Sequence, residues 1–109
     1  MAPVTLWREL EIATRRACTR FKLRPVRLVA STDPRATYLG QCTYAEDDTE
    51  AVITLRVHRL GRPRQPLSRR AILDTLAHEL AHVAAHGHGP AWRAQYVAIR
   101  DYLWGVVGS

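Results

Sequence analysis

The chain has 109 residues, which is enough for one domain and too short for two. Its hydrophobic content of 47% and charged content of 24% are typical of a globular protein and exclude a disordered chain. No segment has the roughly 20 apolar residues of a membrane span, and the charged N-terminal segment lacks the apolar core of a secretion signal. We therefore expect residues 1–109 to form a single cytoplasmic domain that has no membrane partner.

The sequence is strongly basic, with 16 Lys and Arg against 10 Asp and Glu and a formal net charge of +6. Lys22 is the only lysine, so the other basic residues are all Arg. Because the planar guanidinium group binds two phosphate oxygens at once, this charge favours an anionic partner, with nucleic acid first. The alternative is that the arginines reflect genomic base composition and lie on a solvated surface.

The two cysteines, Cys18 and Cys42, lie far apart in the sequence and lack CxxC spacing, which excludes a zinc ribbon within the chain. We expect both to be buried, reduced thiols, as in most cytosolic proteins. The histidines are more informative, because all but one of the five fall between His78 and His88.

The N-terminal half predicts one helix followed by three strands. Residues 5–20 have the spacing of an amphipathic helix, and β-favouring residues predict strands over 26–30, 37–44 and 51–58. The polar segment 45–50 is expected to join the last two strands as an antiparallel hairpin. The apolar stripe of the helix consists of Leu6, Leu10, Ala13, Ala17 and Phe21.

The C-terminal half predicts a loop and two helices. Residues 60–66 are rich in Gly, Pro and Arg and predict a loop. Ser68 is a candidate N-cap, and Leu67 with Ile72 fits a hydrophobic staple. The helix that follows is expected to run through His86 and to stop at Gly87. Its core-facing residues are expected to be Leu73, Leu76, Leu80 and Val83.

A last helix is predicted to start with Pro90 at its first position and to run to Gly105. One helix, three short strands and two helices give an α+β domain, with a small three-stranded sheet that contains antiparallel pairing. The apolar stripe of the last helix is Trp92, Tyr96, Ile99 and Leu103.

The strongest motif is H-E-x-x-H, formed by His78, Glu79 and His82. Residues four apart lie on one face of a helix, so both imidazoles can reach one metal ion. Zinc binds imidazole nitrogens at about 2.0–2.1 Å in tetrahedral geometry. Glu79 is displaced around the helix, where it can hold a metal-bound water without being a ligand. The motif therefore predicts a site for one Zn²⁺ ion.

A catalytic zinc site usually has three protein ligands, so a third is expected. His88 is our choice, because it lies beyond Gly87, where the chain can turn back over the metal. Asp101 is the alternative third ligand. His86 lies too far along the helix from His78 to share the ion with it, and we expect it at the pocket rim or exposed to solvent.

This arrangement implies metal-assisted hydrolysis, in which Glu79 takes a proton from the metal-bound water and passes it to the leaving group. A group that stabilises the oxyanion is also expected, and Tyr96, Arg93 and His86 are the candidates. For Tyr96, the alternative is a packing role on the apolar stripe of its helix. The sequence predicts the chemistry, but it does not decide which of these three side chains stabilises the oxyanion.

Asp74 stands one helical turn before His78 and can orient an imidazole through its second nitrogen. The alternative is an exposed carboxylate or a partner for Arg70. His58 stands alone near the end of a predicted strand, so we expect it to be structural or exposed to solvent.

The metal motif resembles the SprT-like zinc metallopeptidase family. Residues 78–82 read His-Glu-Leu-Ala-His and residues 88–92 read His-Gly-Pro-Ala-Trp. In that family the H-E-x-x-H helix is followed by H-G-x-x-W or H-G-x-x-F, whose His is the third ligand. The stretches 39–42 and 53–55 resemble strand segments of the family, and the whole resemblance covers about residues 35–104.

The resemblance implies a minimal zincin fold, one zinc ion and an endopeptidase acting on protein or peptide substrates. Spartan-type members cut proteins crosslinked to DNA, often with DNA as activator, so DNA is an expected partner through the Arg-rich surface. The short stretch between His82 and His88 matches WLM-type relatives. It also resembles metzincins, but these need a Met-turn, and the only methionine here is Met1.

Two other functions compete with proteolysis. A metal-dependent endoribonuclease is one, because an rRNA-maturation family places three histidines at similar intervals. That family does not need Glu79 and usually has an acidic residue where this chain has Gly87. The other is a non-catalytic DNA- or protein-binding module with structural zinc, which would gain nothing from Glu79.

Overall fold

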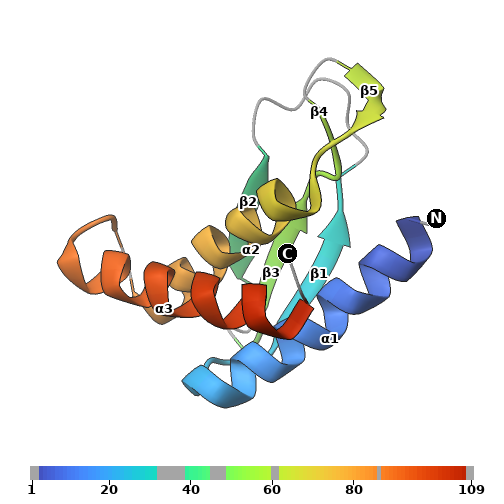
Figure 1. The fold of residues 1–109 in the computed structure, drawn as a ribbon. Coiled ribbons are helices and arrows are strands. Elements are labelled where there is room, and N and C mark those ends of the chain that lie inside the picture. Colours follow the sequence, from blue (N-terminus) through green and yellow to red (C-terminus); the bar gives the residue numbers. More distant parts are fainter. Residues whose placement is uncertain (1–2, 32–38, 45–48, 60–61, 86, 108–109) are drawn as a thin grey trace.

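The computed structural model describes residues 3–31, 39–44, 49–59, 62–85 and 87–107. Three helices lie over one face of a three-stranded sheet, and a two-stranded pair extends from its end (Figure 1). None of the described helices has the length and apolar character needed to cross a membrane. In chain order, the elements are α1 (Pro3–Phe21), β1 (Val26–Ala30), β2 (Gly40–Tyr44), β3 (Ala51–Leu55), β4 (His58–Arg59), β5 (Arg62–Pro66), α2 (Arg69–Ala84) and α3 (Pro90–Val107).

Helix α1 buries the predicted apolar stripe against the rest of the molecule. Leu10, Ala13 and Ala17 are fully buried, and Leu6 and Phe21 pack against the same core. The helix starts two residues before the predicted first residue and ends one residue after the predicted last one. Cys18, near its end, is a free thiol as predicted, but it is only partly buried, as is Cys42 in β2.

The sheet has the strand order β1-β3-β2. Strands β2 and β3 form the predicted antiparallel hairpin, whereas β1 pairs with β3 in parallel. Alternate residues of β3 point into the core, so that Ala51, Ile53 and Leu55 are fully buried beneath the helices. One face of the sheet therefore carries the core, as expected for an α+β domain.

Three predictions for the strands are wrong. The second strand starts at Gly40, since Leu39 before it is not in a strand, and residues 37–38 lie outside the described part of the chain. The third strand ends at Leu55 and not at residue 58, because its partners on both sides end there, at Ala30 and Gly40. The predicted loop over 60–66 contains a strand, β5, which pairs with β4. Proline lacks a backbone donor but is tolerated at sheet edges, so a Pro-rich segment can form this two-stranded pair.

Helix α2 begins as predicted. The Ser68 hydroxyl accepts a hydrogen bond from the Ala71 backbone N–H at 3.1 Å, which caps the helix. The helix ends at Ala84, earlier than predicted, because Ala85 takes an extended conformation with φ −151° and ψ 140°. His86 lies outside the described residues. The buried residues of α2 are Ile72, Leu73, Leu76, Ala77, Glu79, Leu80 and Ala81.

Helix α3 begins at Pro90, as predicted, and runs through Gly105 to Val107, two residues beyond the predicted end. The Gly89 carbonyl accepts the Arg93 N–H at 3.0 Å in its first turn. Its buried residues, Trp92, Ile99 and Leu103, pack against α2 and α1.

Strand β2 approaches α2 closely at Gly40. A Cβ atom at Gly40 would lie 2.6 Å from Thr75 Cγ2 and 3.1 Å from Glu79 Cγ, both on α2. These separations are shorter than van der Waals contact, so the absence of a side chain allows the strand to pack against this helix.

We expect Gly40→Ala to lower the free energy of unfolding by about 1–3 kcal/mol, the usual cost of overpacking. Gly105→Ala is the matched control, because no atom lies within 4 Å of its added Cβ and helix propensity favours Ala by about 0.5–1 kcal/mol. Urea unfolding followed by circular dichroism measures both changes. Equal stability of the two variants would contradict the close approach at Gly40.

Candidate metal centre

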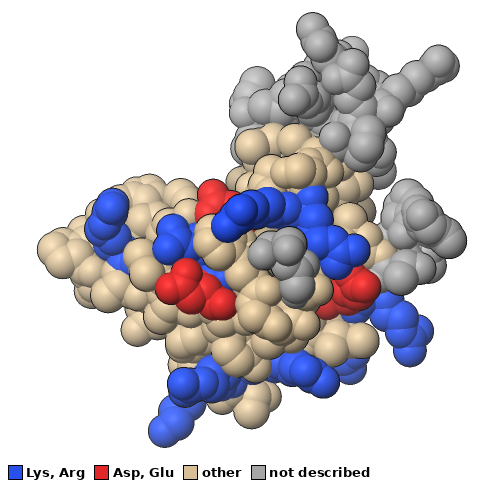
Figure 2. Space-filling model, in the orientation of Figure 1, with Lys and Arg blue, Asp and Glu red and all other residues tan. Residues whose placement is uncertain are grey.

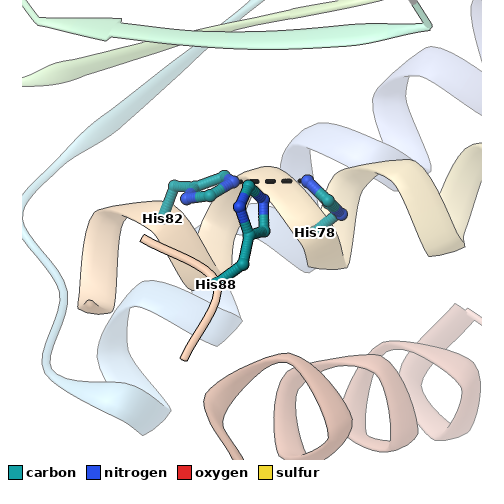
Figure 3. Close-up of side chains that lie close together, drawn as sticks. All are labelled: His78, His82 and His88. Atoms are coloured by element: carbon teal, nitrogen blue, oxygen red, sulfur yellow. Dashed lines mark hydrogen bonds between the residues drawn. The ribbon is translucent and has the colours of Figure 1, made fainter. Parts of the chain in front are cut away.

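The structure brings His78, His82 and His88 together. One ring nitrogen from each lies within 4.8 Å of the others, and among the described residues this is the one such group of three His, Cys, Asp or Glu side chains. The Nε2 atoms of His78 and His82 are 3.2 Å apart (Figure 3). Two nitrogens bound tetrahedrally to one zinc ion lie about 3.3 Å apart. The cluster is therefore compatible with a metal ion.

Two local features create this cluster. His78 and His82 are one turn apart on α2, so their rings project from the same face of the helix. Gly87 has a φ of +75°, in the left-handed region that favours glycine, and the chain turns there between α2 and α3. His88 follows this glycine, and its ring reaches back over α2 toward the other two (Figure 3).

The surroundings of the cluster favour the neutral form of His78. Burial lowers the pKa of His78, the nearby His88 lowers it further, and the charge of Asp74 opposes both effects. Metal binding requires deprotonated imidazole, so a lowered pKa reduces competition by protons near neutral pH. His88 is exposed while the other two are partly buried, which leaves one side of the cluster open to solvent.

Glu79 is buried, with 8% of its surface exposed, and it faces a groove between α2 and β2. The groove has a volume of about 410 Å³ and is also lined by His82 and Tyr44. Burial raises the pKa of Glu79. The raised pKa favours proton acceptance by this carboxylate near neutral pH, as general-base chemistry requires. Glu79 therefore opens onto the same groove as one imidazole of the cluster.

Strand β2 supplies groove residues for which sequence alone predicts no role in the site. Gly40, Cys42 and Tyr44 alternate along the strand and line the groove opposite α2. The Tyr44 hydroxyl donates to the His82 carbonyl oxygen at 3.3 Å, which ties the end of the strand to the helix. No short motif marks these residues, because only the pairing of β2 with β3 sets which of them face the helix.

Asp74 accepts a hydrogen bond from the Tyr96 hydroxyl, so this contact joins α2 to α3 beside the cluster. The carboxylate is partly buried, unlike the exposed residue considered as an alternative, and Arg70 instead lies over the Trp104 ring, 4.4 Å from its centroid. Asp74 acts on His78 through its charge. Burial, and then the bond to Asp74, raise the pKa of Tyr96.

Trp92 is an aromatic neighbour of the cluster. Its ring centroid lies 4.8 Å from that of His78, 5.3 Å from that of His82 and 4.8 Å from that of His88. The sequence placed Trp92 on the apolar stripe of the last helix and in the H-G-x-x-W pattern of the family that the motif resembles. It gave the ring no contact with the candidate ligands.

The other site residues suggested by the sequence are Asp101, Arg93 and His86, and His58 is the remaining histidine. Asp101, the alternative third ligand, is exposed and forms an ion pair with Arg100 at 3.2 Å, outside the histidine cluster. Arg93 is exposed on the first turns of α3. His86 falls outside the described residues, and His58 begins β4, where its side chain is outside the described ones as well. The structure therefore gathers His88, and not Asp101, with the H-E-x-x-H histidines.

No family model and no curated protein matches the sequence. Two crystal structures match the fold: a mutant of Wss1 and Wss1, both from Saccharomyces cerevisiae. Their TM-scores are 0.73 and 0.72, with 17% and 19% sequence identity. The alignments cover 94% and 93% of this chain and 79% and 76% of those chains. The chain has the fold of Wss1.

This match confirms the fold expected from the sequence. The N-terminal helix, the three-stranded mixed sheet and the two C-terminal helices around a three-histidine cluster form a Wss1-like α+β fold. The resemblance to SprT-like and WLM-type proteins, inferred from the metal motif, agrees with this structural match. At 17–19% identity, the match to Wss1 shows the fold alone. The activity has to be inferred from the residues of the site.

We expect the purified protein to bind about one zinc ion and His88→Ala to lose most of it, because two imidazoles alone do not complete the ligand set. Asp101→Ala, on an exposed residue of α3, is the control and should keep its zinc. Elemental analysis after gel filtration measures the zinc-to-protein ratio. Full retention by His88→Ala would exclude His88 as a ligand.

Proposed function

We propose that this chain is a zinc-dependent endopeptidase. The observation that carries the proposal is the buried Glu79 carboxylate, which opens onto a groove that is also lined by His82 of the histidine cluster. Burying an ionisable group is costly, and a site whose zinc is only structural would gain nothing from it. A carboxylate that shares a groove with a candidate metal ligand is placed as a general base for hydrolysis requires.

The chain's residues divide the chemistry among them. His78, His82 and His88 would hold the ion, which supplies Lewis-acid polarisation and a more acidic water when bound. Glu79 takes the proton of the attacking water and gives it to the leaving nitrogen of the scissile bond. The exposure of His88 leaves room for a substrate carbonyl on the open side of the cluster.

The groove suits an extended peptide. Within the described sheet, β2 pairs with β3 on one side only, and its end borders the groove that contains Glu79. A substrate backbone can add to such an edge as a further strand, which presents successive peptide bonds to the site. This arrangement supports protein or peptide substrates for the proposed activity.

The hydroxyl of Tyr96 donates to Asp74, so its geometry supports a role in positioning Asp74 beside His78 more than a role as oxyanion donor. Arg93 is exposed and has a long side chain at the start of α3. We therefore propose Arg93 as the better oxyanion candidate among the described residues.

We expect Glu79→Gln to lower the rate of casein cleavage by about 10²–10⁴-fold, the usual contribution of a general base, while zinc content stays near one. Glu11→Gln, a change of the same kind at an exposed residue of α1, is the matched control and should cleave at the wild-type rate. Gel-based cleavage assays with elemental analysis measure both properties.

Structured RNA is included as a second substrate in the same assay. RNA cleavage that survives Glu79→Gln would overturn the peptidase proposal in favour of a metal-dependent endoribonuclease. Absence of any cleavage by a zinc-loaded wild type, on free and on DNA-bound protein, would favour the structural-zinc module.

We further propose that the substrate is bound to DNA and that α1 and β1 supply the DNA-binding surface. Every charged residue between positions 12 and 31 is basic. Figure 2 shows Lys and Arg side chains along the lower border of the molecule, where α1 lies. Arg15, Arg16 and Arg20 line a hollow of about 380 Å³ together with Tyr102.

The arrangement of these arginines supports a function outside folding. Arg16 and Arg20 are four apart on α1, where like charges destabilise a helix. Neither they nor Arg15 form an ion pair with any residue in the part of the chain that the structure describes. Exposed guanidinium groups of this kind suit the phosphate backbone of nucleic acid.

We expect a variant with Arg16→Ala and Arg20→Ala to bind duplex DNA more weakly and to reduce the slope of log affinity against log salt by about 2. The control variant, Arg93→Ala with Arg100→Ala, removes the same charge from α3 and should bind like the wild type. Fluorescence anisotropy across a salt series gives both slopes. Equal losses in the two variants would contradict a binding surface on α1.

A further inference from the structure

We propose that Trp92 is a positioning residue that holds the three imidazoles of the cluster in a metal-binding arrangement before any ion arrives. The inference rests on the metal site of the proposed function and does not depend on peptide hydrolysis. Trp92 is 7% exposed, and its indole ring contacts His78, His82 and His88 at once. No other aromatic ring in the described chain is recorded against all three.

The contacts of Trp92 restrict the histidine rings directly. The indole meets His78 and His88 nearly edge to face, at interplanar angles of 69° and 71°, and lies tilted by 32° against His82. A free imidazole rotates about two side-chain bonds, and ordering it at the moment of metal binding costs entropy. Packing against Trp92 orders the three imidazoles when the chain folds. Metal binding then loses less entropy, so metal affinity increases.

The indole is itself held in place from behind. It stacks on Tyr96 with the rings parallel to within 1° and the centroids 5.2 Å apart. The Tyr96 hydroxyl donates to Asp74, which lies one turn before His78 on α2. Trp92, Tyr96 and Asp74 therefore connect α3 back to the helix that carries the first two histidines, so the wall of the site is fixed from both helices.

The indole N–H of Trp92 does not contribute to the positioning of the imidazoles. The Trp92 Nε1–H is buried without a hydrogen-bond partner in the described structure, so the ring acts through its shape and its faces. Phenylalanine retains an aromatic ring and removes the unpaired N–H, whereas leucine removes the ring altogether. Metal affinity should therefore fall in the order wild type, Trp92→Phe, Trp92→Leu.

Trp104 provides a matched control on the same helix. Its ring lies near the guanidinium groups of Arg70 and Arg100, at 4.4 and 4.9 Å, and no contact with a histidine of the cluster is recorded. Trp104→Phe makes the same chemical change as Trp92→Phe at a distance from the imidazoles.

The test measures zinc affinity by competition with a chromophoric chelator, alongside thermal unfolding of each metal-free variant. We expect about tenfold weaker zinc binding for Trp92→Phe and about 100-fold for Trp92→Leu, the range found when groups that orient metal ligands are removed. Trp104→Phe should bind zinc like the wild type. A Trp92→Phe affinity equal to that of Trp104→Phe would overturn the proposal.

A second readout keeps the test independent of folding stability. Cu²⁺, a paramagnetic ion, should quench the fluorescence of a tryptophan that contacts its ligands, and Trp92→Phe should lose most of this quenching while Trp104→Phe retains it. If affinity falls only in proportion to the loss of metal-free stability, Trp92 is a packing residue and the proposal fails, whatever the quenching shows. Persistent casein cleavage by Glu79→Gln would instead contradict the general-base role of Glu79 and would leave the role of Trp92 untouched.

Discussion

Helix α2 is packed on the sheet by one face and carries the histidines on another, and the rest of the site depends on that packing. Leu73, Leu76 and Leu80 are completely buried, so the helix cannot rotate about its axis without exposing them. This constraint fixes the direction in which His78 and His82 project. The hydrophobic core therefore orients the first two candidate ligands, and the third requires only a chain reversal after the helix.

The same packing explains why the Glu79 carboxylate is buried and why its pKa is raised. Because β2 approaches α2 at a residue without a side chain, the carboxylate lies against the strand and away from bulk solvent. Burial raises its pKa. A close contact between strand and helix, made for packing reasons, thus also creates the environment in which a carboxylate accepts a proton most readily near neutral pH.

Sequence reasoning succeeded where the determinants are local. The boundaries of β1, the Ser68 cap and the start of α3 at Pro90 follow from short-range chemistry, and the pairing of His78 with His82 follows from helical periodicity. It failed where partners are distant. The parallel pairing of β1 with β3 has no local signature, and residues 62–66 become a strand only because β4 lies beside them. Trp92 fits an apolar stripe equally well whether or not histidines lie against it.

The order of strands in the sheet has a consequence for how the chain folds. The central strand, β3, comes last of the three in the sequence, after both of its neighbours. Its antiparallel partner β2 is close to β3 in the sequence, so the hairpin closes a short loop. The parallel partner β1 is farther from β3 in the sequence, so their pairing closes a longer loop. During synthesis, β1 is made before either strand of that hairpin, so it can pair with β3 only after β2 and β3 have followed it along the chain.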